Sequence, residues 1–241
     1  MRAARISVLL LAAYALLWVG GVASHLAWRR TPEGVGWTAP AFLFSAAALL
    51  LLNLPGARLW LTLVGVGGFL AELGGSKLGI PFGSYSYTGQ LQPQLAGVPV
   101  VMFCAWVILI VYVRSSLVRL ALRGWVRGAA GATWMTAIDL VIDPVATRAL
   151  DFWRWHEPGI YYGIPLSNFA GWFLVSAVLL APREGAGLPN RWAHGIGLSV
   201  VLFFGILAAA HRMAAPAAVA AALVMADLAA LRFSRRRPDF A

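Results

Sequence analysis

Two aspartates, Asp139 and Asp143, lie in an otherwise apolar segment that runs from residue 134 to residue 145. A carboxylate in hydrocarbon is unfavourable unless it is paired, faces a polar cavity or carries a proton. Because the two acids are four residues apart, they share one face of a helix. We interpret the pair as the chemical centre of the chain. The alternative is that both acids form salt bridges to Arg148, Arg154 or Lys77 that only fix helix packing.

Pro144 directly follows the second aspartate. A proline disfavours helical geometry at the residue before it and lacks the amide that would bond to the carbonyl of Leu140. The sequence therefore predicts a helix break beside the acids, with backbone polar groups that need water or another partner.

A third acid, Glu72, lies near the end of an apolar segment rich in glycine. Small residues allow helices to pack closely, and they could equally form a groove for a flat, rigid ligand. Aromatic residues crowd the region after the aspartates, among them Trp155, Tyr161, Tyr162 and Trp172. Trp and Tyr are common at the interface between membrane and water, which would explain these residues. Aromatic ring faces also stabilise cations.

The sequence offers little for metal or cofactor chemistry. Its four histidines are scattered, with no HxxxH, HxxHH or HExxH spacing, and its one cysteine excludes an intrachain disulfide and a cysteine metal cluster. Walker and GxGxxG motifs are absent as well. We therefore expect no metal and no cofactor, and acid–base chemistry remains.

The composition is that of a membrane protein, since 61% of the residues are hydrophobic and only 12% are charged. The net charge of +10 lies mostly between or beyond the apolar runs, which suits lipid head groups better than nucleic acid. Arg119, Arg123 and Arg127 recur every four residues, so we expect them to share a helical face that binds anionic lipid.

Eight apolar segments approach the roughly 20 residues that a helix needs to cross the hydrocarbon. The first resembles a signal peptide, but its apolar part is too long for one, so we expect a retained span. The predicted fold is an all-α integral membrane protein, a bundle of seven or eight transmembrane helices forming one polytopic domain over residues 1–241. The predicted spans are Ile6–Trp28, Trp37–Leu54, Leu59–Gly75, Val98–Val113, Trp125–Val145, Ile164–Ala181, Trp192–Ala210 and Met213–Leu231.

Lys and Arg are more numerous on the side of the bundle that carries the chain ends. This bias predicts a multi-pass protein of the cell (cytoplasmic) membrane with both termini in the cytoplasm. The ends of the odd-numbered spans and the starts of the even-numbered ones then meet at the outer face. Six polar residues approach one another there: His25, Glu72, Asp139, Asp143, Asn168 and His211.

Two polar segments are expected at the same face. Residues 77–99, which carry Tyr85 and Tyr87, are rich in proline and glycine and predict an interfacial or re-entrant hairpin. This hairpin is either an ordinary loop or a lid over a site. Residues 146–163 form a polar, aromatic loop.

Three segments carry a resemblance to a known family. Residues 79–88 (GIPFGSYSYT), 139–144 (DLVIDP) and 161–172 (YYGIPLSNFAGW) are similar to the carotenoid biosynthesis family of membrane proteins that hydrate acyclic carotenoid ends. This family includes the γ-carotene 1′-hydroxylases and the bisanhydrobacterioruberin hydratases. The similarity extends from about Glu72 to Trp172.

The resemblance implies addition of water across the C1′=C2′ double bond of an acyclic (ψ) end group, which gives a tertiary alcohol. An acid would protonate C2′, and water would capture the cation at C1′. We assign Asp143 as the acid and Asp139 or Glu72 as the base that positions water, although the order can be reversed. Burial and a neighbouring carboxylate both favour the protonated form that the acid needs.

The same resemblance implies a carotenoid substrate, namely lycopene, γ-carotene or a C50 relative, with membrane lipid and neighbouring carotenoid enzymes as further partners. Asn168 would hold the water, and Tyr161, Tyr162 and Trp155 would face the cation. The remaining expected substrate contacts are Tyr85, Tyr87 and Trp172.

Two other functions fit parts of the pattern. Asp139-x-x-x-Asp143 matches half of the magnesium–diphosphate site of a UbiA-like membrane prenyltransferase, but the second aspartate-rich motif of such enzymes is missing. Their site also faces the cytoplasm, opposite to the predicted orientation. A non-catalytic carotenoid-binding protein would need only the groove and the aromatic residues.

Overall fold

The computed structural model describes residues 2–120, 122, 124–181 and 190–235. This part of the chain contains eight α-helices, so the predicted all-α bundle is confirmed. A short 3₁₀ helix, η1 (Pro55–Ala57), leads directly into α3. The helices are α1 (Arg2–Trp28), α2 (Thr38–Asn53), α3 (Arg58–Leu78), α4 (Val101–Arg119), α5 (Gly124–Arg148), α6 (Leu166–Leu179), α7 (Arg191–Ala210) and α8 (Ala214–Arg235).

The outer surface of the bundle is apolar. Five of the described helices, α1, α3, α4, α7 and α8, are long and apolar enough to cross a membrane, while α2 and α6 are shorter apolar helices. Large side chains such as Leu16 on α1 and Val178 on α6 are each 74% exposed. Exposed apolar surface on this scale is typical of contact with lipid, and the chain is a membrane protein.

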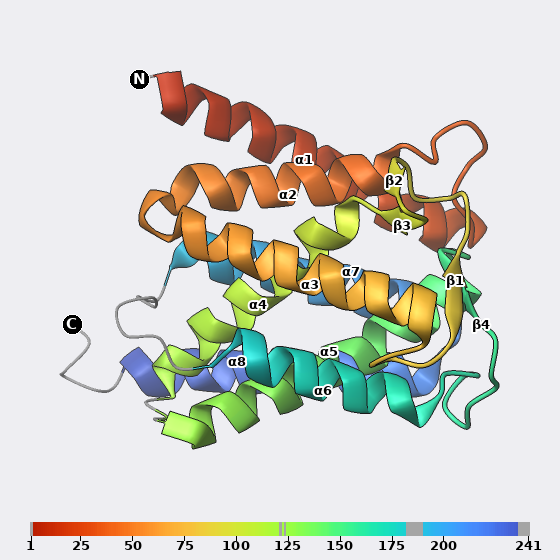
Figure 1. Ribbon diagram of the computed structural model, residues 1–241. Coiled ribbons are helices and arrows are strands. Elements are labelled where there is room, and N and C mark those ends of the chain that lie inside the picture. Colours follow the sequence, from red (N-terminus) through yellow and green to blue (C-terminus); the bar gives the residue numbers. More distant parts are fainter. Residues whose placement is uncertain (1, 121, 123, 182–189, 236–241) are drawn as a thin grey trace.

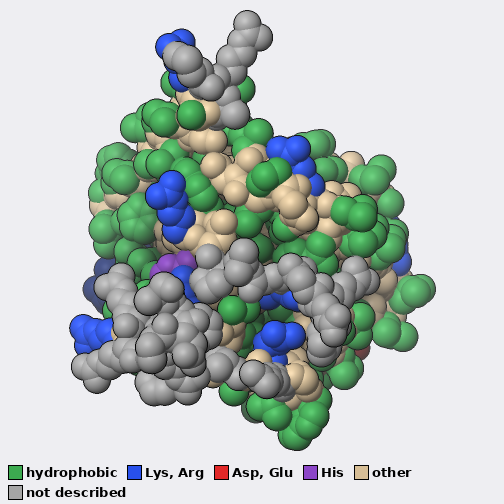
Figure 2. All heavy atoms as spheres, turned by 90° about the vertical axis from the view of Figure 1, so that its left-hand side faces the viewer, with side chains coloured by type: hydrophobic (Ala, Val, Ile, Leu, Met, Phe, Trp, Pro, Cys, Tyr) green, Lys and Arg blue, Asp and Glu red, His purple; other side chains and the backbone are tan. Residues whose placement is uncertain are grey.

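The helices run alternately in opposite directions, so both chain ends lie at one end of the bundle and the strands at the other (Figure 1). Figure 2 views the end that carries the termini and shows Lys and Arg side chains spread over it. Basic residues stand at or near the helix starts on this side, including Arg58 of α3, Arg127 of α5 and Arg191 of α7. This is the end that we predict to face the cytoplasm.

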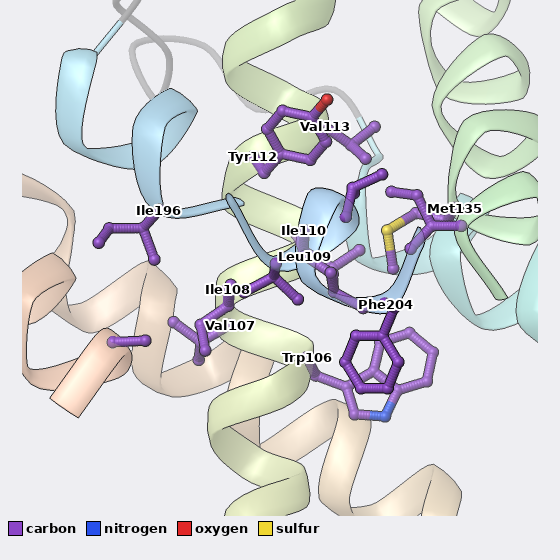
Figure 3. Close-up of a cluster of buried hydrophobic side chains, with 14 of the residues drawn as sticks. Trp106, Val107, Ile108, Leu109, Ile110, Tyr112, Val113, Met135, Ile196 and Phe204 are labelled. Carbon is purple, nitrogen blue, oxygen red and sulfur yellow. The ribbon is translucent and has the colours of Figure 1, made fainter. Parts of the chain in front are cut away.

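Helix α4 forms the axis of the bundle and packs against α2, α3, α5, α7 and α8. Its side chains are buried on every face, as expected for a helix that is apolar all round. Figure 3 shows the α4 residues from Trp106 to Val113 surrounded by side chains of other helices, such as Met135 of α5 and Phe204 of α7. This core fixes the positions of the helices that carry the acids.

The predicted lipid-binding face made by three arginines is wrong. Helix α4 ends at Arg119 and α5 begins at Gly124, so Arg119 and Arg127 lie on different helices. Arg119 is buried, with its guanidinium 4.0 Å from the carboxylate of Asp227 on α8. Arg123 lies outside the described residues.

Asp227 of α8 has two further partners besides Arg119. Ser116 of α4 donates a hydrogen bond to Asp227 over 2.8 Å, and His194 of α7 bonds to the other carboxylate oxygen. Three helices are thereby joined by one buried carboxylate near the end of the bundle that carries the termini.

The loops at the opposite end form two small antiparallel sheets. Strand β2 (Gln94–Leu95) pairs with β3 (Val98–Pro99), and this part of the polar segment is a hairpin. Strand β1 (Tyr85–Tyr87) instead pairs with β4 (Trp153–Trp155) of the loop after α5. Because side chains alternate along a strand, the aromatic residues of both strands point toward the helices, while Ser86 and Arg154 are exposed.

We predict that cysteines replacing Ser86 and Glu157, in a Cys104→Ala background, react with impermeant thiol reagents from outside intact cells. Both positions are exposed at the strand end of the bundle, whereas Cys104 is buried. Gly56→Cys provides a matched control at the opposite end, because Gly56 is exposed in the turn between α2 and α3. Labelling of the Gly56 position alone in intact cells would reverse the orientation.

Candidate active site

Helix α5 carries both aspartates and continues without a break from Gly124 to Arg148, with Pro144 inside it. The predicted break is therefore wrong, because a side chain from the loop after α5 replaces the hydrogen bond that Pro144 cannot make. The hydroxyl of Tyr161 donates a hydrogen bond to the Leu140 carbonyl over 2.9 Å, where the amide of residue 144 would otherwise bond. A side chain from the following loop thus satisfies the carbonyl that proline leaves free, and the helix holds both acids on one face.

Asp143 accepts hydrogen bonds from three N–H groups. The indole nitrogens of Trp153 and Trp155 lie 2.8 and 3.2 Å from Oδ1, and the amide nitrogen of Asn168 lies 2.8 Å from Oδ2. Such donors stabilise the charged form of a carboxyl group. These donors would stabilise the Asp143 carboxylate once its proton has left, although the residue is only 1% exposed.

Asn168, in the first turn of α6, connects the two aspartates. Its amide nitrogen also lies 2.6 Å from Oδ2 of Asp139, and because an amide nitrogen has two hydrogens it can donate to both acids at once. The other oxygen of Asp139, Oδ1, is buried without a hydrogen-bond partner in the described part of the chain. An oxygen in that position favours a neutral, protonated Asp139.

Glu72 is the third buried acid, at 4% exposure, and three donors surround it. The hydroxyls of Tyr85 and Tyr87 lie 2.5 and 2.7 Å from Oε2, and the indole nitrogen of Trp106 lies 3.0 Å from Oε1. Gly68 makes room for that indole, since a Cβ at this position would lie 2.2 Å from the Trp106 ring. The glycine-rich sequence of α3 therefore serves close packing against α4.

The two tyrosines remain donors at any physiological pH. Burial, followed by the negative charge of Glu72, raises the pKa of the Tyr85 hydroxyl far above its ordinary value. The same two causes raise the pKa of Tyr87. Both hydroxyls therefore keep the protons that they donate to Glu72.

Two of the acids, Glu72 and Asp143, lie on the wall of a cavity of about 20 Å³, enough for roughly one water molecule. Asp139 is not on this wall and is joined to Asp143 through Asn168. The remaining wall residues are mostly aromatic: Phe82, Tyr85, Tyr87, Met102, Trp153, Trp155, Asn168 and Trp172.

The acids have no cationic partner in the region that the structure describes. Arg148 donates to the backbone carbonyl of Tyr162, and Arg154 pairs with the exposed Asp151. The alternative of arginine salt bridges to Asp139 and Asp143 is thus wrong. Neutral N–H and O–H groups satisfy the carboxyl groups instead, so no positive side chain among the described residues offsets their charge when they ionise.

The structure brings most of the predicted substrate contacts together. Five of them, Tyr85, Tyr87, Trp155, Asn168 and Trp172, line the cavity. Tyr161 and Tyr162 do not, because Tyr161 caps Leu140 and the ring of Tyr162 faces Arg148 with 5.6 Å between guanidinium carbon and ring centre.

The two histidines that the topology brought to this end do not join the acids. His25 and His211 form a hydrogen bond to each other, with 3.0 Å between the ring nitrogens. His25 lies on the wall of a different, larger cavity. Their place at the predicted end of the bundle is right, but they are not part of this site.

Sequence reasoning missed two donors of the site. Trp153 bonds to Asp143, and the signal was available, since it alternates with Trp155 in a short strand. Trp106 bonds to Glu72 and stacks on Trp172 with 4.5 Å between ring centres. Trp106 lies in the apolar first part of α4, and its indole N–H, which needs a partner, was the available signal.

Fold and site together define a polytopic membrane protein with a buried, cation-free acid cluster beside a water-sized cavity. The family model described as "Carotenoid biosynthesis protein" matches residues 35–227. The chain belongs to this carotenoid biosynthesis family.

A curated relative is the bisanhydrobacterioruberin hydratase of Haloarcula japonica, which is 34% identical over 112 residues. The alignment covers 44% of this chain and 38% of the relative, so the chain spans well under half of that protein. No solved structure matches the chain.

We predict that Tyr161→Phe weakens α5 beside the acids, because the buried Leu140 carbonyl loses its donor at a cost of about 1–3 kcal/mol. Amide hydrogen exchange in residues 140–148 should become faster, and the thermal midpoint of the purified protein should fall. Tyr162→Phe is the matched control, since the carbonyl of Tyr162 and not its hydroxyl receives the bond from Arg148. Equal exchange in both variants would contradict the capping role.

Proposed function

We propose that the chain is a carotenoid hydratase that adds water to the C1′=C2′ double bond of an acyclic end group. The observation that carries this proposal is the acid pair bridged by Asn168 beside a water-sized cavity with aromatic walls. Membership of the carotenoid biosynthesis family and the hydratase relative support the same reaction. The substrate class is lycopene, γ-carotene or a C50 relative.

Asp143 is the proposed acid, because it lies on the cavity wall and can touch the substrate. An alkene is a very weak base, so its protonation needs a strong acid. The three N–H donors stabilise the carboxylate that remains when the proton has left, which increases the acidity of Asp143. Asp139 keeps its own proton throughout, so that Asp143 can ionise without leaving two neighbouring buried carboxylates.

Protonation of C2′ uses the π electrons of the double bond and leaves a positive charge at C1′. The cavity suits this cation, since its acids have no cationic partners among the described residues and its walls present aromatic rings. Ring faces and fixed negative charge both stabilise a cation in a site that excludes water. Trp153, Trp155 and Trp172 are the nearest candidates.

Glu72 is the proposed base. It lies across the cavity wall from Asp143, and its Oε1 accepts one hydrogen bond, so a lone pair remains for a water molecule. Water attacks C1′ and gives a proton to Glu72, and that proton returns to Asp143 to complete the cycle. The sum is one alkene and one water giving one tertiary alcohol, with no oxidant or reductant.

The donor set argues against a magnesium–diphosphate site. A metal ion binds to carboxylate lone pairs, but three of the roughly four on Asp143 already accept N–H bonds, and one is left. Bidentate metal binding by Asp143 would need these donors to move away. A hydrating acid needs them where they are.

The proposed setting is the cell membrane with both termini in the cytoplasm. The substrate is insoluble in water, so enzymes that make or use acyclic carotenoids are proposed neighbours in the same membrane. Lipid surrounds the apolar outer surface of the bundle.

We predict that Asp143→Asn and Asp139→Asn each lower hydration at least ~10²-fold, as expected when a general acid is lost. An amide keeps the shape of the side chain but supplies no acidic proton. Glu72→Gln should have a smaller effect if Glu72 mainly orients water. Product should be measured by mass in cells that make lycopene or γ-carotene, together with the amount of protein in the membrane.

Asp151→Asn is the matched control for these variants. Asp151 is exposed on the loop after α5 and pairs with Arg154, and asparagine tolerates its positive φ of 49°. This variant should hydrate normally. Near-normal turnover in both site aspartate variants would remove Asp139 and Asp143 from the mechanism.

A second prediction separates hydration from oxidation. In heavy-oxygen water, membranes supplied with an acyclic carotene should form labelled tertiary alcohol without dioxygen, reductant or added metal. In deuterated water the product should gain deuterium at C2′, because protonation of the alkene places it there. Hydroxyl oxygen that came from dioxygen would exclude this mechanism.

A further inference from the structure

Three cavities follow one another from the surface of the bundle to the acids. The largest has a volume of about 320 Å³ and lies among α1, α2 and α7. A middle cavity of about 60 Å³ is lined by apolar and aromatic side chains. The third is the water-sized cavity of the candidate active site.

Adjacent cavities share wall residues. Leu43, Phe152 and Phe204 line both the largest and the middle cavity. Met102, Trp153 and Trp172 line both the middle cavity and the acidic one. Side chains shared by both walls therefore separate each cavity from the next.

The cavity of about 320 Å³, the outermost of the three, opens toward lipid. Leu16 and Trp28 of α1 stand on its wall, and they are 74% and 64% exposed on the apolar outer surface. Gly20 lies between them on the same helix and is exposed as well. A molecule dissolved in the membrane can reach this mouth without crossing water.

We propose that this series of cavities is the passage by which a linear polyene brings its acyclic end from the lipid to the acids. The inference rests on the proposed function and extends it to the route of the substrate. The reacting end lies in the middle cavity against the acidic cavity, which holds the water, and the rest of the polyene extends into the mouth. The narrow middle cavity favours an acyclic end over a bulky ring.

The molecule provides a matched pair of positions for a test. A Cβ on Gly20 would meet no atom within 4 Å, so Gly20→Phe adds a ring to the mouth without a clash. Gly195 of α7 is equally open and lies on a second groove of about 370 Å³ between α1 and α7. That groove shares no wall residue with the passage, and Gly195→Phe is therefore the control. Ala105→Leu obstructs the middle cavity independently.

Each variant should be made in cells that produce lycopene and purified in mild detergent. The pigment retained per protein is measured by absorption, and the alcohol formed is measured by mass. Gly20→Phe and Ala105→Leu should each retain at least about tenfold less lycopene than the unaltered protein, whereas Gly195→Phe should retain a normal amount.

Retention and product separate the two proposals. Normal retention in both Gly20→Phe and Ala105→Leu, or an equal loss in Gly195→Phe, overturns the passage even if alcohol forms. A second outcome is that lycopene retention falls in Gly20→Phe and Ala105→Leu but not in Gly195→Phe, while the unaltered protein forms no alcohol. This outcome supports the passage and overturns the hydratase proposal.

Discussion

One electrostatic constraint organises the end of the bundle that carries the strands. Three buried carboxyl groups there have no cationic partner in the described chain, and they depend on neutral hydrogen-bond donors. A hydrogen bond to a charged group contributes about 1.5–3 kcal/mol, and a buried charge without such bonds is far less favourable. The donors come from β1, β4, α4 and α6, so the need to satisfy the acids fixes these elements relative to α3 and α5. The same arrangement leaves the acids of the cavity without a positive neighbour among the described residues, a setting in which a carbocation would be stabilised.

The two ends of the bundle use buried carboxylates differently. Near the chain termini, Asp227 is surrounded by Ser116, His194 and Arg119, so its charge is compensated and its role is to join helices. Near the strands, Asp143 and Glu72 receive only N–H and O–H groups. A carboxylate with a positive partner suits helix packing. Neighbouring carboxyl groups without one, such as Asp139 and Asp143, hold protons more readily and suit proton transfer.

Hydropathy, span length and charge bias were enough to predict the helical bundle, because lipid imposes these features on each segment separately. The convergence of Glu72, Asp139, Asp143 and Asn168 at one end followed from the alternating direction of the spans. Contacts between distant segments could not be predicted in this way. The pairing of β1 with β4 and the bond from Trp106 to Glu72 each join residues that no local pattern relates.

The two main errors have the same origin. Pro144 predicted a helix break, but Tyr161, seventeen residues later, supplies the missing donor. The spacing of Arg119 and Arg127 predicted one helical face, but the turn between α4 and α5 separates them. In both cases a rule that holds within one helix was overridden by a neighbouring element, which a single sequence does not reveal.

The pairing of β1 with β4 also constrains how the protein is made. Glu72 and the strand that covers it leave the ribosome long before Trp153, Trp155 and Asn168 are synthesised. All three donors of Asp143 come later in the chain than Asp143 itself, from β4 and α6. The bonds that stabilise its carboxylate therefore form only once α6 has packed against α5. A chain truncated before β4 would keep the acids but lose every donor of Asp143, so the acid cluster is completed only late in membrane insertion.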